Sequence, residues 1–180
     1  RMTRDDGWRL LSIGRHIERL GFLAASLELG FSTGSVHDAS GFEAMIALFD
    51  STITFHAQYQ QSHDVVALLD LLVMDRDNPR SLGWVAQTLR GRLARLAGSA
   101  PGELAALSLN VPNPDLWDLE DLCRTEMEHA PEPGPTTEQA PSTPLLQLLE
   151  QCTQSAYTVS DDISAVYFTH SGEAKQSLGV

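Results

Sequence analysis

The stretch WRLLSIGRHIERLGFLAASLEL, residues 8–29, decides the fold that this sequence predicts. Its apolar residues recur at intervals of three and four, as they do along one side of an α helix. Asp5 or Asp6 suits the N-terminal cap, and Gly30 follows the predicted end. A helix that is apolar on more than one side is typically central. The sequence therefore predicts a helical fold built around this segment. The stripe that we expect to face the core is Ile13, Ile17, Leu20, Ala24 and Leu27.

The remainder of the chain predicts further helices. The same periodicity marks residues 41–60, 64–74, 79–96, 115–129 and 145–169. For residues 64–74 a buried strand is the alternative, but the Leu and Ala content favours a helix. No pair of strand-like segments joined by a hairpin turn occurs. The sequence thus predicts an all-α fold, an antiparallel helical bundle of about six helices.

We expect residues 1–180 to form a single helical domain. Residues 130–144 contain five prolines and a glycine, a composition typical of a linker or an extended loop inside it. The chain opens with Arg1-Met2, and a helix follows almost at once. This opening favours a C-terminal part of a longer protein.

Charge and composition exclude several classes of partner. The net charge of −12 argues against nucleic acid and against an anionic membrane surface. Residues 1–98 hold ten arginines and eleven acids, so an anionic ligand should prefer this part. No signal peptide or membrane-spanning run is apparent. The cysteines, Cys123 and Cys152, lack metal-ligand spacing, and Cys152 falls on an apolar stripe. We expect a reducing, cytoplasmic location.

Three charged residues interrupt the apolar helix. Glu18 follows Arg15 by three residues, so their side chains can meet on one face, and Arg19 is adjacent. Because this face also carries large apolar side chains, we expect the charges to be partly buried and to need partners. Two interpretations remain open. One is an internal ion-pair network that fixes helix packing, and the other is a basic pocket for a phosphate, a carboxylate or a peptide terminus.

A second candidate region is the turn around Asn78-Pro79-Arg80. Asn78 suits a helix cap and Pro79 the first helical position, which is the structural interpretation. Alternatively, Arg80 joins the anion site together with the local backbone N–H groups. Asp50 lies at the margin of the second helix and is a candidate partner. The predicted set of binding residues is Arg15, Glu18, Arg19, Asp50, Asn78 and Arg80.

Other catalytic and metal chemistry has little support. Glu126 and His129 have the Glu-x-x-His spacing of di-metal bundles, but the motif occurs only here. Nothing in the sequence suggests a catalytic triad around His56, His63 or His170. No glycine-rich phosphate loop is present. The sequence predicts no metal and no cofactor, and it identifies no catalytic residue.

Residues 2–11, followed by Gly14 to Arg19, resemble the alpha-E domain of bacteria. That family is all-helical and named for a Glu-Arg motif, matched here by Glu18 and Arg19. Asn78 to Ser81 resembles its middle signature. Ile163-Ser164 with Tyr167, Phe168 and His170 resembles its closing helix, whereas His56 stands where we expect Arg in relatives. Full family domains are longer, and this chain resembles their second, C-terminal half.

The resemblance implies a setting rather than a reaction. Family members are encoded beside, or fused to, a circularly permuted ATP-grasp protein, often with a transglutaminase-like peptidase. It therefore implies an accessory helical domain that binds an ATP-grasp-type peptide ligase, or its peptide or anionic substrate. The alternative is an enzyme of the same peptide-modification pathway, with Glu18 as a general base held by two arginines.

Overall fold

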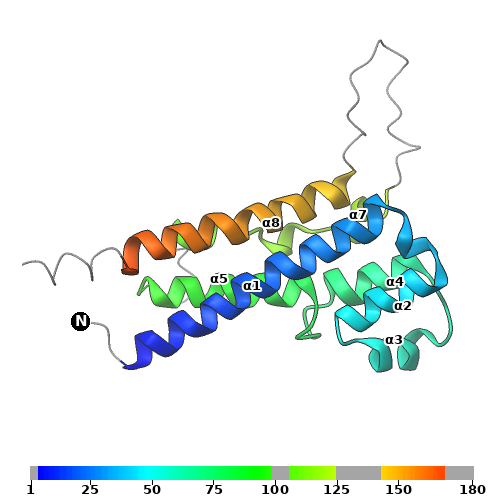
Figure 1. Cartoon of the computed structure of the whole chain (residues 1–180), viewed down its shortest axis with the longest axis horizontal. Helices are drawn as coiled ribbons and strands as arrows, with labels where there is room; N and C mark the ends of the chain where they lie inside the picture. The colour runs from blue at the N-terminus through cyan, green and yellow to red at the C-terminus, as the bar shows by residue number, and fades with distance from the viewer. Residues whose placement is uncertain (1–3, 99–105, 125–142, 169–180) are drawn as a thin grey trace, which may run out of the picture.

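The computed structural model describes residues 4–98, 106–124 and 143–168, and Figure 1 shows their arrangement. These residues form helices and turns with no strand, so the prediction of an all-α fold is confirmed. The α helices are α1 (Arg4–Ser32), α2 (Ala39–Leu48), α3 (Thr52–Tyr59), α4 (Val65–Leu69), α5 (Leu82–Leu96), α6 (Ala106–Leu109), α7 (Leu119–Leu122) and α8 (Pro144–Ile163). Shorter 3-10 turns are η1 (Ser35–His37) and η3 (Pro114–Leu116), and π-helical turns are η2 (Asp70–Met74) and η5 (Ser164–Phe168).

The long helix α1 organises the fold. It packs along both α5 and α8, and both of these helices run in the opposite direction to it (Figure 1). Helices α2, α3 and α4 gather around the end at which α1 finishes. The predicted central position of this segment is therefore confirmed. Among the described residues, no helix combines the length and apolar character needed to cross a membrane.

The core is built from the predicted apolar stripes. Leu20, Ala24 and Leu27 of α1 are fully buried. Burying one such Leu side chain contributes roughly 1.5–3 kcal/mol to folding. Cys152 of α8 lies in the same core as a free thiol, and burial raises its pKa to about 12. Its predicted role as a core thiol is confirmed. Other core residues from the three long helices are Ile13, Ile17, Leu23, Leu82, Val85, Leu89, Leu93, Leu149, Val159 and Ile163.

Gly30 does not end the first helix, contrary to the prediction. Helix α1 continues to Ser32, and a left-handed residue, Gly34 with φ 74°, follows. A Cβ atom at Gly30 would collide with the Met45 side chain of α2. The atom that it would meet is the terminal methyl group of Met45, which lies over Gly30 where α2 contacts the end of α1.

The helix predicted over residues 41–60 is divided into α2 and α3. The chain turns at Asp50, which has a left-handed φ of 49°, and the buried Ser51 hydroxyl donates to the Phe49 carbonyl (2.9 Å). The break changes the phase of the apolar pattern. Ile53, expected on the inner side, is 86% exposed, whereas Phe55 is buried.

Two later helices also begin or end differently from the prediction. The cap of α5 is Ser81 rather than Asn78, because the Ser81 hydroxyl accepts the Trp84 N–H (3.0 Å). The predicted helix over 115–129 is replaced, within the described residues, by η3 and the single turn of α7. Residues 130–142 of the predicted loop lie outside the described residues, and Thr143 caps α8.

Candidate functional site

The charged triplet of α1 lies on the surface of the molecule. Arg15 and Glu18 are exposed and Arg19 is half-buried, so the prediction of partial burial is wrong for the first two. No ion pair joins any of the three to another described residue. The reason is the orientation of α1. The face of α1 that contains Leu20 packs into the core. The opposite face, which contains Phe22, is also apolar but faces outward.

Arg15 and Glu18 border open hollows along the seam between α1 and α8. One hollow of about 500 Å³ is bordered by both residues, and a neighbouring one of about 400 Å³ by Glu18. Gly14, Ile17 and Ser160 border both hollows. The walls are largely apolar, so these two charges stand beside apolar surface without an internal partner. Large side chains exposed on this side are Leu11, Phe22, Tyr157 and Phe168.

The other three predicted residues bind one another or the backbone nearby. Arg80 Nε lies 2.9 Å from Asp50 Oδ2, an ion pair between α5 and the break after α2. The Asn78 side-chain oxygen Oδ1 accepts the Arg80 backbone N–H (3.1 Å). The Asn78 side-chain nitrogen Nδ2 donates to the Leu71 backbone carbonyl (3.2 Å). Asn78 thus stabilises the turn before α5 and does not cap the helix, contrary to the structural interpretation.

A basic edge runs along the contact between α1 and α5. The rings of His16 and Trp84 lie 5.9 Å apart, and the two helices are antiparallel. From this contact, Arg19 on α1 and Arg80 before α5 extend in one direction, because Arg19 is one turn after His16 and Arg80 precedes Trp84 by four residues. Arg92 and Arg95 extend in the other. We call Arg19, Arg80, Arg92 and Arg95 the basic edge.

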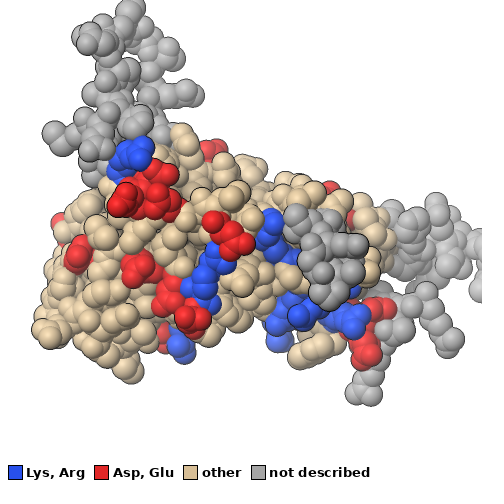
Figure 2. Space-filling view, turned by 180° about the vertical axis from the view of Figure 1, so that it is seen from behind, with Lys and Arg blue, Asp and Glu red and all other residues tan. Residues whose placement is uncertain are grey.

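Most of the basic edge is available to an outside partner. Arg19 and Arg92 are half-buried and Arg95 is exposed, and none of these three pairs with an acid among the described residues. Figure 2 shows one group of basic side chains at the lower right of the view, whereas the basic side chains in its centre and at its upper left lie beside acidic ones. The local charge is thus opposite in sign to the net charge of −12.

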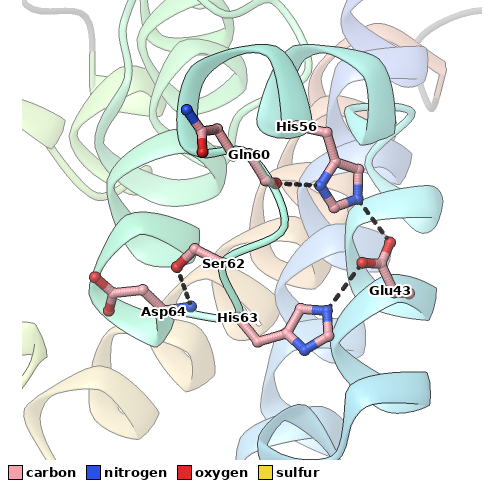
Figure 3. Close-up of polar contacts among 6 residues, drawn as sticks. All are labelled: Glu43, His56, Gln60, Ser62, His63 and Asp64. Carbon is pink, nitrogen blue, oxygen red and sulfur yellow. Dashed lines mark hydrogen bonds and ion pairs between the residues drawn. The ribbon is translucent and has the colours of Figure 1, made fainter.

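A carboxylate bound by two histidines lies at the other end of the molecule (Figure 3). Glu43 Oε2 is 3.0 Å from His56 Nε2, and Glu43 Oε1 is 3.1 Å from His63 Nε2. The sequence analysis missed this cluster because Glu43 is on α2, 13 and 20 residues before the histidines. No spacing rule joins residues so far apart, and only the fold of α3 back along α2 brings them together. We call these three residues the Glu43 clasp.

Both ring nitrogens of His56 face acceptors. Nε2 faces Glu43, and Nδ1 lies 2.6 Å from the Gln60 backbone carbonyl. A carbonyl can only accept, so satisfying both contacts requires two N–H groups, which is the cationic form of the ring. The Gln60 bond first, and the Glu43 bond second, raise the pKa of His56. The bonds from His56 and His63 lower the pKa of Glu43.

The metal and thiol chemistry considered from the sequence involves residues in several parts of the chain. No group of three or more His, Cys, Asp or Glu side chains in this part of the chain is placed to hold a metal ion. Glu126, His129 and His170 lie outside the described residues. A further hollow of about 640 Å³, between the end of α1, α4, α7 and the start of α8, is mainly apolar. Cys123 borders it as a free thiol, and burial raises the pKa of that thiol.

Comparison with known proteins places the chain in a family. Residues 1–168 match a family described as a predicted alpha-helical domain with a conserved ER motif. The sequence contains that dipeptide once, at Glu18-Arg19. Uncharacterized proteins of Mycobacterium bovis and Mycobacterium tuberculosis are each 33% identical over 102 residues, which cover 55% of this chain and 11% of the relative. The chain thus matches about a tenth of the length of these relatives. No solved structure matches it significantly.

Proposed function

The chain belongs to the Alpha-E family, and from that premise we propose that it is an accessory domain for an ATP-grasp-type peptide ligase. In this role, the basic edge holds an acidic segment of the ligase or of its peptide substrate. The supporting observation is that three arginines along α1 and α5, Arg19, Arg92 and Arg95, pair with no acid in the part of the chain that the structure describes. The ligase itself comes from the family resemblance.

The chemistry of the edge suits carboxylates better than other ligands. A guanidinium presents a planar fork of N–H donors that matches a carboxylate. A single exposed ion pair contributes only about 0–1 kcal/mol, so useful affinity requires several pairs along an extended segment. The edge is a surface rather than an enclosed pocket, which fits a peptide better than a small anion. Because these charges are exposed, binding should weaken as salt is added.

The alternative of Glu18 as a general base has no supporting contact. Glu18 is exposed, and neither Arg15 nor Arg19 forms an ion pair with it. A general base is usually held in place by neighbouring groups and close to a proton of the bound substrate. We therefore give partner binding priority over catalysis.

The first test measures binding of a fluorescent oligoglutamate peptide. The variant Arg92→Gln/Arg95→Gln should bind at least tenfold more weakly than the wild type at low salt, because two unpaired guanidinium groups are lost. The control Arg76→Gln/Arg124→Gln changes net charge equally, but its arginines already pair with Asp115 and Asp121. Equal affinity for both double variants would contradict a role for the basic edge.

The second test uses a reconstituted reaction with the neighbouring ATP-grasp protein. Arg19→Ala should weaken ligase or substrate association and slow product formation in proportion. Glu18→Gln should leave turnover at saturating partner concentration unchanged. Loss of turnover in Glu18→Gln, with folding and ligase association intact, would instead establish the enzyme alternative.

A further inference from the structure

The outward side of α1 has its own regular pattern, distinct from the buried stripe. Its exposed residues follow one another at intervals of three, four, three, four and three, which is the 3.5-residue repeat of a coiled-coil seam. Trp8 is 65%, Leu11 50% and Phe22 52% exposed. We call this set the outer seam: Trp8, Leu11, Arg15, Glu18, Phe22 and Ala25.

The spacing of the outer seam is symmetric about its midpoint. Arg15 and Glu18 are equally far from the midpoint between His16 and Ile17. Leu11 and Phe22 form the next pair outward from that midpoint, and Trp8 and Ala25 form the last. Each pair joins complementary members: a base with an acid, two apolar side chains, and a large ring with a small methyl group. Such a face is self-complementary only when the second helix is antiparallel.

We propose that the outer seam is a dimer interface, in which α1 pairs with α1 of a second copy of this chain in antiparallel orientation. The two-fold axis passes near the midpoint between His16 and Ile17. Arg15 of each copy then faces Glu18 of the other, so the interface contains two reciprocal ion pairs. Leu11 faces Phe22 of the second copy, and Trp8 faces Ala25. This isologous arrangement is the commonest symmetry of protein dimers.

The surface around the outer seam has room for a second helix. Gly14 borders both hollows along α1, and a Cβ atom there would meet nothing within 4 Å. Apolar side chains of the second copy can therefore enter the hollows beside the seam. Tyr157 on α8, 68% exposed, extends the apolar surface on that side. Pairing from Trp8 to Ala25 spans 18 residues, or about 27 Å of helix.

The second copy fits this surface better than an unrelated helix. The match of charge and size at three successive pairs follows from the sequence of α1 alone and requires no outside partner. The inference goes beyond the proposed function, because the basic edge follows the α5 side of α1 and the outer seam lies away from it. Either can fail without the other.

The test is a charge-reversal cycle measured by sedimentation equilibrium. The wild type should be a concentration-dependent dimer. In Glu18→Arg, Arg15 of each copy would face the new arginine of the other copy. These two like-charge contacts should weaken dimerisation at least tenfold. Arg15→Glu/Glu18→Arg restores opposite charges across the axis and should restore the dimer. Glu150→Arg on α8, also exposed, changes the charge equally and should leave the dimer unaffected. A monomeric wild type, or no rescue in the double variant, would overturn the proposal.

Disulfide trapping tests the antiparallel register. In a Cys123→Ser background, Leu11→Cys/Phe22→Cys should yield a covalent dimer on mild oxidation. Within one helix these positions are about 16 Å apart. A disulfide requires Cα atoms within about 7 Å, so it can form only between copies. Trp8→Cys/Phe22→Cys, out of register, should cross-link much less. Equal cross-linking of both pairs would contradict the proposed register.

Discussion

The two ends of the molecule treat charged residues in opposite ways. Around α2 and α3, the Glu43 clasp, the Asp50–Arg80 ion pair and the Tyr59–Asp70 hydrogen bond (3.1 Å) match charged or polar groups within the chain. Along the first half of α1 and the far end of α5, five charged residues have no such partner within residues 4–98, 106–124 and 143–168: Arg15, Glu18, Arg19, Arg92 and Arg95. The first end uses charge to hold its own structure together. The second presents charge for contacts outside the chain.

The sharpest form of this comparison lies within α5, in two arginines two residues apart. Arg90 donates from one guanidinium nitrogen to the backbone carbonyls of Ser108 and Val111, whereas Arg92 has no such contact. Arg90→Met should cost about 2 kcal/mol of unfolding free energy, because it removes two hydrogen bonds and leaves the Val111 carbonyl without this donor, while the Ser108 carbonyl still accepts the Val111 N–H. Arg92→Met should change it by less than about 0.5 kcal/mol. Urea unfolding measures the free energy of both variants. Equal losses in Arg90→Met and Arg92→Met would contradict the proposed difference between a bonded and an unbonded arginine.

Substitution of Ser81, which lies just before α5, should have a smaller effect on the free energy of unfolding. Its buried hydroxyl accepts the Trp84 N–H and donates to the Asp75 carbonyl. Loss of a helix cap costs about 1 kcal/mol. Ser81→Ala should therefore lower the unfolding free energy by about that amount, and Ser81→Thr is the conservative control. Wild-type stability in the alanine variant would show that this cap is dispensable.

The smallest expected effect is the pH dependence of the Glu43 clasp. His56 has a pKa above its ordinary value of 6.5, so its contribution is complete below pH 6.5 and is lost as pH rises through the folded pKa. Glu43 has a pKa below its ordinary value of 4.5, so its contribution is present above pH 4.5 and is lost as pH falls through the folded pKa. The clasp is strongest between these values.

Amide hydrogen exchange in α3 can detect this pH window. After correction for intrinsic exchange rates, protection of α3 should fall as the pH rises above 6.5 and through the raised pKa of His56. His56→Gln should flatten this dependence, whereas His37→Gln, outside the clasp, should not. An unchanged pH profile in His56→Gln would contradict the role of the clasp.

Local sequence patterns predicted the helices and the side of α1 that faces the core, but not that its second apolar side would face outward. The stripe containing Leu20 and the seam containing Leu11 and Phe22 are both apolar. The charges were therefore expected to be buried, when the face that carries them is outward. Periodicity measures amphipathic character along one segment, and the choice between two apolar faces depends on α5 and α8. The acids in the first turn of α1 and the buried Cys152 were predicted because each depends on residues within one helix.

Contacts across the chain account for what the sequence did not reveal. The break at Asp50 coincides with its ion pair to Arg80, which lies 30 residues later. Asn78 has the residue type of a cap but stabilises the preceding turn, and Ser81 takes that position at α5. Glu43 was not singled out at all, because its partners come from the next helix and the turn after it. Of the predicted binding residues, Asp50 and Arg80 lie together as expected, and Arg15 and Glu18 open toward solvent.

The most direct test of the two kinds of charge is NMR measurement of hydrogen exchange at the arginine guanidinium N–H groups of the free chain. Arg80 and Arg90, bonded to Asp50 and to backbone carbonyls, should exchange slowly. Arg19, Arg92 and Arg95 should exchange at least several-fold faster and become protected when an acidic peptide is added. Uniform exchange rates in the free chain, or no gain in protection with the peptide, would contradict the account.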